Sequence, residues 1–229
     1  MSAVHRLVSP IPAQQQITAV LVDAHALYRT GLRELLEHDG IAILGEAPCV
    51  ESALRLVEHH RPDVVVVDPD IPGQPEADGR AAIARIKARA PSSAVLALAR
   101  TSNDHDVVDI VCMGGSCFLL KDAAAETIVA GVRAAAAGES LIAPKLAATL
   151  VRRLRASGAG ERPQPRSVLS DREQEVLRLI AAGKDNDEIA AELFISRHTV
   201  KNHISSILLK LEVTNRVQAA VVAVRAAIV

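Results

Sequence analysis

The chain has 229 residues, a formal net charge of −1 and almost no aromatic side chains: one Tyr, two Phe and no Trp. This length has room for one large domain or two modest ones, and the core must be aliphatic and rich in alanine. The balanced charge excludes a global field that would attract nucleic acid or a membrane, and three irregularly spaced cysteines exclude a disulfide framework or a zinc site.

Residues 1–16 are expected to form a disordered tail, and a regular alternation begins at Ile17. Short apolar runs predict strands, and stretches such as 50–60, with apolar residues at i, i+3, i+4 and i+7, predict amphipathic helices. Strands that alternate with helices predict an α/β domain with a doubly wound, five-stranded parallel sheet over residues 17–140. The predicted strands are 17–22, 41–45, 64–68, 94–98 and 116–120, and the predicted helices are 27–37, 50–60, 79–89, 105–113 and 122–137.

The third of these strands ends on an acid, in the stretch "PDVVVVDPDIPG". A continuous valine run predicts a strand buried on both faces. Its carboxyl end is where open α/β sheets place their chemistry. Asp68 is therefore either a functional carboxylate or an ordinary turn residue, and the local sequence favours neither.

A second domain follows a linker at 141–167. A further helix is predicted from Pro144 to Ala156, and the stretch "ASGAGERPQPRS" after it has the Gly, Pro and charge content of a flexible tether. The strand pattern does not return after this linker. Residues 168–229 therefore predict a small all-α domain of four helices.

Helix-start signals divide this second domain. Ser170 and Asp185 each precede a glutamate by three residues, which is the capping-box pattern, and Ser196 caps a longer helix, "RHTVKNHISSILLKL". The apolar stripe of that helix must face a core, whereas its other side is polar and basic. Two helices joined by a short turn, the second with a basic outer face, predict a helix-turn-helix. A small helical bundle with a solvated face is the alternative.

The stretch from Leu169 to Val213 resembles the LuxR-type DNA-binding domain nearly end to end. The resemblance implies that the helix after Ser196 enters the major groove of double-stranded DNA, where Lys and Arg hold phosphates or guanine edges and Asn reads adenine. The residues implied to contact DNA are Ser196, Arg197, Thr199, Lys201, Asn202, His203 and Ser205.

The final helix, "RVQAAVVAVRAAIV", has more apolar surface than one contact needs. One stripe, of Val217, Ala220, Val221 and Val224, is enough to dock the helix on its own domain. The excess face predicts an interface, and the resemblance implies a homodimer on two-fold symmetric sites. Packing against the first domain is the alternative. The residues predicted for the dimer interface are Ala219, Val222, Ala223 and Ala226.

Over the whole chain after residue 16, the two domains resemble the NarL/FixJ family of two-component response regulators. The resemblance implies a flavodoxin-like receiver in which Asp68 accepts a phosphoryl group from a histidine kinase and Lys121 contacts that group. It also implies Mg²⁺ held by an acidic pair after the first strand, together with Asp68.

Two positions depart from that pattern. Ala24 follows Asp23 where the family has the second acid of the pair, and Ala99 stands where the family has a Thr or Ser that bonds the phosphoryl oxygen. Phe118 keeps the family's aromatic residue. Asp70 is a candidate to supply a compensating carboxylate, and Thr101 or Ser102 to supply the hydroxyl.

We therefore expect an atypical receiver, not switched by ordinary Mg²⁺-dependent phosphorylation, in a cytoplasmic DNA-binding transcriptional regulator without membrane contacts. The receiver would serve as a dimerisation or small-molecule-sensing scaffold, with Asp68 and Lys121 as a buried ion pair. The alternative is a conventional regulator phosphorylated on Asp68. A remote alternative is a haloacid-dehalogenase-like phosphatase with Asp68 as nucleophile, but no later acidic pair supports it, and we expect no enzyme.

Overall fold

The computed structural model describes residues 16–71, 79–100, 104–140 and 168–226. The helix predicted from Pro144 to Ala156, the tether after it, the tail up to residue 15, and Thr101 and Ser102 lie outside these residues. Within the described part, no helix is both long and apolar enough to cross a bilayer.

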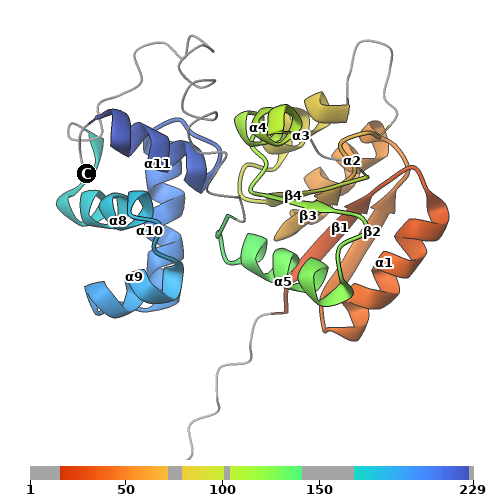
Figure 1. Cartoon of the computed structure of the whole chain (residues 1–229), viewed down its shortest axis with the longest axis horizontal. Coiled ribbons are helices and arrows are strands. Elements are labelled where there is room, and N and C mark those ends of the chain that lie inside the picture. Colours follow the sequence, from red (N-terminus) through yellow and green to blue (C-terminus); the bar gives the residue numbers. More distant parts are fainter. Residues whose placement is uncertain (1–15, 72–78, 101–103, 141–167, 227–229) are drawn as a thin grey trace, which may run out of the picture.

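The prediction of a doubly wound, five-stranded parallel sheet is confirmed (Figure 1). The strand order β2-β1-β3-β4-β5 is that of flavodoxin-like folds. The strands are β1 (Thr18–Val22), β2 (Ala42–Ala47), β3 (Val64–Val67), β4 (Ala94–Ala99) and β5 (Cys117–Leu120), and the helices between and after them are α1 (Ala26–His38), α2 (Val50–His60), α3 (Gly79–Arg89), α4 (Asp104–Cys112) and α5 (Ala125–Ala136).

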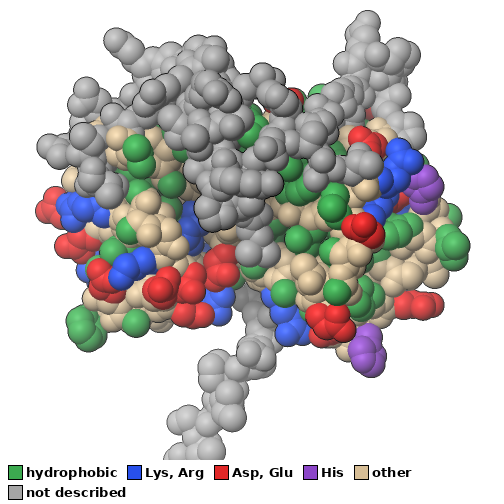
Figure 2. All heavy atoms as spheres, in the orientation of Figure 1, with side chains coloured by type: hydrophobic (Ala, Val, Ile, Leu, Met, Phe, Trp, Pro, Cys, Tyr) green, Lys and Arg blue, Asp and Glu red, His purple; other side chains and the backbone are tan. Residues whose placement is uncertain are grey.

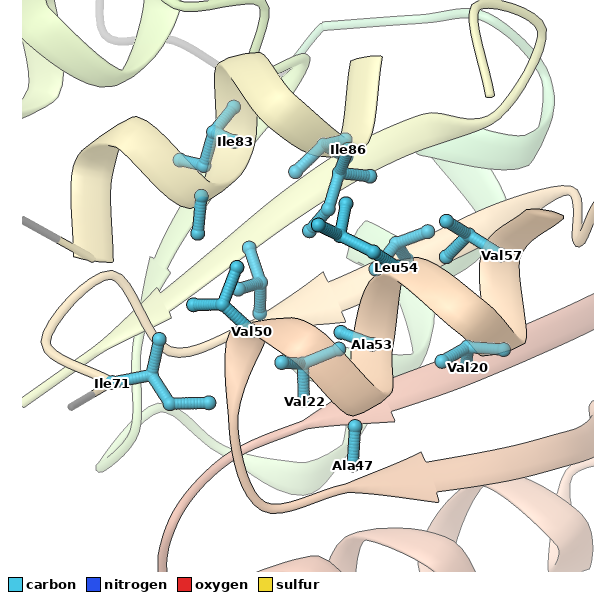
Figure 3. Close-up of a cluster of buried hydrophobic side chains, with 14 of the residues drawn as sticks. Val20, Val22, Ala47, Val50, Ala53, Leu54, Val57, Ile71, Ile83 and Ile86 are labelled. Carbon is cyan, nitrogen blue, oxygen red and sulfur yellow. The ribbon is translucent and has the colours of Figure 1, made fainter. Parts of the chain in front are cut away.

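Helices cover both faces of the sheet, which is why its inner strands β3 and β4 are apolar without interruption. Val65 and Val67 belong to the apolar cluster on the side of α2 and α3, whereas Val64 and Val66 belong to the cluster on the side of α1 and α5. Figure 3 shows how α2 and α3 pack on the sheet in the first of these clusters. All four valines are at most 2% exposed. Burying each one stabilises the fold by roughly 1.5–3 kcal/mol relative to an exposed valine.

The second domain consists of four helices around its own aliphatic core. They are α8 (Asp171–Ala181), α9 (Asn186–Leu193), α10 (Arg197–Lys210) and α11 (Arg216–Arg225). Both predicted capping boxes are present, at Ser170 and at Asp185, and Ser196 caps α10 by accepting from Thr199 N–H at 3.0 Å. These caps fix the residue at which each helix begins. Because α9 ends at Leu193 and Ser196 caps α10, the turn between these two helices is short.

Glu173 links the first and third helices of this domain. Besides closing its capping box, its carboxylate accepts from Ser206 Oγ at 2.6 Å and from Lys210 Nζ at 2.7 Å, both on α10. Burial raises the pKa of Glu173, but the hydrogen bonds from Lys210, Ser206 and Ser170 outweigh it and hold the pKa at about 2. Glu173 therefore remains ionised through the neutral range.

This depressed pKa predicts an acid-sensitive second domain. The contribution of Glu173 to stability is fully present above its ordinary pKa of 4.5 and is lost as the pH falls towards about 2. Glu173→Gln is expected to lower the free energy of unfolding by about 2 kcal/mol at pH 7, measured by urea denaturation. The matched control, Glu175→Gln, removes a half-exposed pair with Arg172 and should lose about 0.5 kcal/mol or less. Equal losses in the two variants would contradict the assignment.

The two domains meet along α4 and α11. Val108 and Val111 of α4 pack against Val221, and Val217 packs against the same cluster. In the view of Figure 2, acidic and basic side chains are interspersed over both domains. The contact between the domains thus includes a small apolar cluster between α4 and α11.

Candidate functional site

Two buried carboxylates lie side by side at the carboxyl edge of the sheet. β1 and β3 are neighbours in register, Val22 beside Val67, so Asp23 and Asp68, one residue beyond each strand, meet at the point where the strand order reverses. Asp23 is 4% exposed and Asp68 is 3% exposed. The fold, rather than any local motif, brings these two acids together.

Lys121 bridges the two carboxylates. It follows β5, where its backbone N–H donates to Ala99 O at 2.8 Å. Its Nζ lies 2.7 Å from Asp68 Oδ2 and also donates to Asp23 Oδ2. The side chain of Lys121 is 10% exposed. One ammonium group thus neutralises part of the charge of both acids.

Asp23 has further partners. His25 donates to Asp23 Oδ1 from its backbone N–H at 2.8 Å, and its ring Nδ1 lies 3.0 Å from the same oxygen. Burial raises the pKa of the Asp23 carboxyl, but the hydrogen bonds from Lys121 and His25 outweigh it, so the pKa lies below its ordinary value. Asp23 is therefore an ionised carboxylate whose two oxygens both have partners.

An aromatic ring covers the lysine. Lys121 Nζ lies 4.7 Å from the centroid of the Tyr28 ring, a distance at which a cation is attracted to the ring face. Burial, and then the charges of Asp23 and Asp68, raise the pKa of Tyr28 to about 12. Tyr28 thus stays neutral and holds the ammonium group towards the two acids.

Within the described part of the chain, the pocket has fewer oxygen ligands than the resemblance implies for Mg²⁺. Ligand atoms of Asp23, His25 and Asp68 lie within 4.8 Å of one another, but a methyl group stands at Ala24 and the Lys121 ammonium already bridges the two acids. Mg²⁺ requires near-ideal octahedral oxygen ligation. Asp23 and Asp68 are the two residues that would hold it, and no third carboxylate joins them among the residues that the structure describes.

Asp70 does not replace that third carboxylate. Its backbone N–H donates to Asp68 Oδ1 at 2.8 Å, whereas its side chain is 42% exposed and points towards Arg100, 4.0 Å away. Ala99 is 2% exposed, and its methyl group cannot donate a hydrogen bond. Phe118 is half-buried and packs against the sheet core.

The helix predicted to read DNA has the two faces that its sequence indicates. Val200, Ile204 and Ile207 are buried in the domain core, while the opposite side is polar. Four of the predicted DNA-contacting residues besides Ser196 are exposed and two are half-buried. The exposed four are Arg197, Lys201, Asn202 and Ser205, and the half-buried two are Thr199 and His203.

This polar face lies against the receiver. Lys201 Nζ donates to Ala136 O at 2.7 Å, and Arg197 forms an ion pair with Glu139 at 3.1 Å. Asn186 of α9 donates to the neighbouring carbonyl of Ala137. Two of the basic groups that would contact DNA are therefore occupied by the carboxyl end of α5 and the residues after it.

The last helix faces its neighbours differently from the prediction. Ala219 and Ala223 are fully buried and Val222 is 7% exposed, all three in the core of their own domain, and Ala226 packs against the same core. Of the stripe predicted to dock on that core, Ala220 does pack there, whereas Val217 and Val221 pack against the receiver. The two faces are therefore not divided as predicted, because α11 is apolar on both.

Two polar residues that the sequence analysis did not single out fasten this contact. Asn215 Nδ2 donates to Val111 O at 2.9 Å and to Gly115 O at 3.1 Å. Gln218 Nε2 donates to Val111 O at 3.0 Å and to Cys112 O at 3.2 Å. The one signal in the sequence was the helix cap at Asn215, which indicates the start of α11 and nothing about the receiver.

Comparison with known proteins agrees with both halves of this architecture. Residues 19–133 match the response regulator receiver domain, and residues 167–223 match the bacterial regulatory proteins of the luxR family. A receiver joined to a helix-turn-helix defines a DNA-binding transcriptional response regulator.

Relatives align over nearly the whole chain. The transcriptional regulatory protein LiaR of Bacillus subtilis is 39% identical over 91% of this chain and 97% of its own. The nitrate/nitrite response regulator NarL of Escherichia coli is 32% identical over 91% and 95%. A solved structure of RcsB from Salmonella typhimurium is 25% identical, with a TM-score of 0.52, over 90% of this chain and 97% of that one. The chain belongs to the NarL/FixJ family of response regulators.

Proposed function

We propose that this regulator controls access to its DNA-reading helix through the contact between its domains, and that its receiver is not switched by ordinary Mg²⁺-dependent phosphorylation of Asp68. It would act in the cytoplasm as a homodimer on paired DNA half-sites. A cognate histidine kinase belongs only to the alternative, in which Asp68 is a conventional phosphoacceptor.

The observation that carries the receiver proposal is the bridging position of Lys121. Its ammonium group lies between Asp23 and Asp68, while the residues at 24 and 99 end in methyl groups. An incoming phosphoryl group would need charge neutralisation and hydrogen-bond donors around its oxygens. Without the second acid and the hydroxyl, Asp68 and Lys121 function as a structural ion pair.

The contact between the domains supports control by occlusion. The last carbonyl groups of a helix carry partial negative charge. At the end of α5 they accept Lys201 and Asn186, while Glu139 accepts Arg197. These acceptors of the receiver take the place of DNA phosphates as hydrogen-bond partners of α10, the DNA-reading helix. DNA binding requires this contact to break. The receiver therefore inhibits DNA binding in the closed form, in which the two domains are in contact.

Intact-mass analysis after incubation with Mg²⁺ and acetyl phosphate tests the receiver proposal. We expect no phosphoryl adduct on the native chain, because the third carboxylate and the hydroxyl are absent. The variant Ala24→Asp/Ala99→Thr should gain an adduct, since it restores both groups.

The control adds Asp68→Asn to that restored variant, which should remove the adduct again. An adduct on the native chain that disappears in Asp68→Asn would overturn the proposal. The protein would then be a conventional kinase-driven regulator.

A further inference from the structure

A groove runs between α1 and the start of α5, on the outer side of Lys121. Its volume is about 660 Å³, and its walls are mainly apolar, with Leu27, Leu32 and Leu35 from α1 and Ile128 from α5. Volumes of roughly 300–1,000 Å³ with apolar walls and a few polar groups are typical of small-molecule sites. The groove is separate from the DNA-reading face and from the contact between the domains.

A glycine lines this groove. Gly31 lies in the interior of α1, where glycine destabilises a helix by about 1 kcal/mol relative to alanine. A Cβ placed on Gly31 would have no atom within 4 Å, so no neighbour requires the side chain to be missing. Leu27, one turn earlier, is 87% exposed at the rim. The groove thus presents apolar surface that no described residue covers.

One end of the groove is cationic. Arg100 and Lys121 both line it. Lys121 is held by Asp23 and Asp68, but Arg100 is 62% exposed and reaches only Asp70, at 4.0 Å, among the described residues. Its guanidinium group therefore keeps its hydrogen-bond donors for a planar anionic group, such as a carboxylate, to which arginine binds in a bidentate manner.

We propose that this groove binds a small apolar carboxylate, with its hydrocarbon body over Gly31 and its carboxylate at Arg100. The Lys121 side chain is the wall between this ligand and the two buried acids. Occupancy of the groove therefore acts on the same lysine that a phosphoryl group contacts in an ordinary receiver. This inference goes beyond the proposed function and does not depend on whether Asp68 accepts phosphate.

Isothermal titration of the full chain with 2-naphthoate and with decanoate tests the site, without DNA or phosphodonor. We expect at least one of the two to bind. Gly31→Leu should lower the affinity about ten-fold or more because the new side chain fills the groove, and it should not unfold the chain because the space is open. The control, Thr30→Leu, puts the same side chain on the adjacent exposed position and should bind as the native chain does.

The charge is tested separately. Arg100→Gln should weaken binding of 2-naphthoate about five-fold or more and leave binding of the uncharged 2-naphthamide unchanged. Absence of binding by both acids at millimolar concentration would overturn the proposal, as would equal affinity in Gly31→Leu. If Gly31→Leu instead changes self-association in sedimentation while neither acid binds, the groove is a protein contact and the proposal is wrong.

Discussion

Val108→Glu is expected to raise the affinity of the full chain for DNA about ten-fold or more. Val108 is 2% exposed and lies in the cluster that joins α4 to α11. An unpaired carboxylate is strongly disfavoured in such an apolar contact, and separation of the domains returns residue 108 to water. Under the proposed occlusion only the open form binds DNA, so the apparent dissociation constant falls as the open fraction grows.

Fluorescence anisotropy with a duplex selected from a random-sequence pool, at fixed salt concentration, measures this effect. Val108 contributes to neither cluster that packs on the sheet, so the receiver itself should stay folded. Thr127→Glu is the matched control, since it adds the same charge to an exposed position of α5. Tighter binding in both variants, or in neither, would argue against occlusion.

The opened variant also makes the DNA-reading residues testable. Lys201 donates to the receiver, so under the proposal Lys201→Ala in the native chain would remove a DNA contact and an inhibitory contact at once. Added to Val108→Glu, Lys201→Ala should weaken binding and lower the slope of affinity against salt by about one charge. An unchanged slope of affinity against salt would count against the placement of α10 in the major groove of DNA.

Lys121→Met is expected to lower the free energy of unfolding by about 3–5 kcal/mol. The substitution keeps an apolar chain of similar length but leaves Asp23 and Asp68 buried together without their shared cation. Carboxylate oxygens of Asp23 and Asp68 lie within 4.8 Å of each other, and two like charges at this distance in a buried site repel each other strongly. Chemical denaturation at neutral pH, followed by circular dichroism, measures the loss.

A second substitution distinguishes charge from packing. Asp68→Asn added to Lys121→Met should restore much of the lost stability, because one of the two uncompensated charges is gone. Lys184→Met is the matched control, since Lys184 pairs with Glu192 at the surface, and it should change stability little. If Asp68→Asn gave no rescue, the role of Lys121 would be packing rather than charge.

The receiver fold and its pocket could be predicted from the sequence because each signal was local or topological. The valine run of β3 has the pattern of a strand covered on both sides, and the helix caps at Ser170, Asp185 and Ser196 are short-range chemistry. Once a doubly wound sheet is assumed, the ends of its strands must meet at one edge. The position of Asp68 beside its neighbours follows from that topology.

The contact between the domains could not be predicted in the same way. The hydrogen bonds of Lys201, Asn215 and Gln218 end on backbone carbonyl groups of the receiver, and every residue has such a group, so the receiver sequence holds no complementary signal. The apolar stripes of α11 were ambiguous because periodicity tells how many faces are apolar, not which neighbour each face meets. The outward turn of Asp70 depends likewise on side-chain geometry that spacing does not encode.

The two domains contribute different groups to these hydrogen bonds, so mutations in the two domains should affect the contact differently. The acceptors in the receiver are backbone carbonyl groups, at residues 111, 112, 115, 136 and 137. A substitution that keeps the backbone in place keeps its carbonyl group, except at Gly115, where a Cβ would lie 2.5 Å from Ile110 Cγ2. The donors are side chains of the other domain, and each is lost by a single codon change. Substitutions at these acceptor positions should therefore leave the hydrogen bonds in place, and loss of these bonds should arise mainly from mutation of the donors. In the receiver, the contact should be sensitive instead at Val108, Val111 and Glu139, whose side chains take part in it.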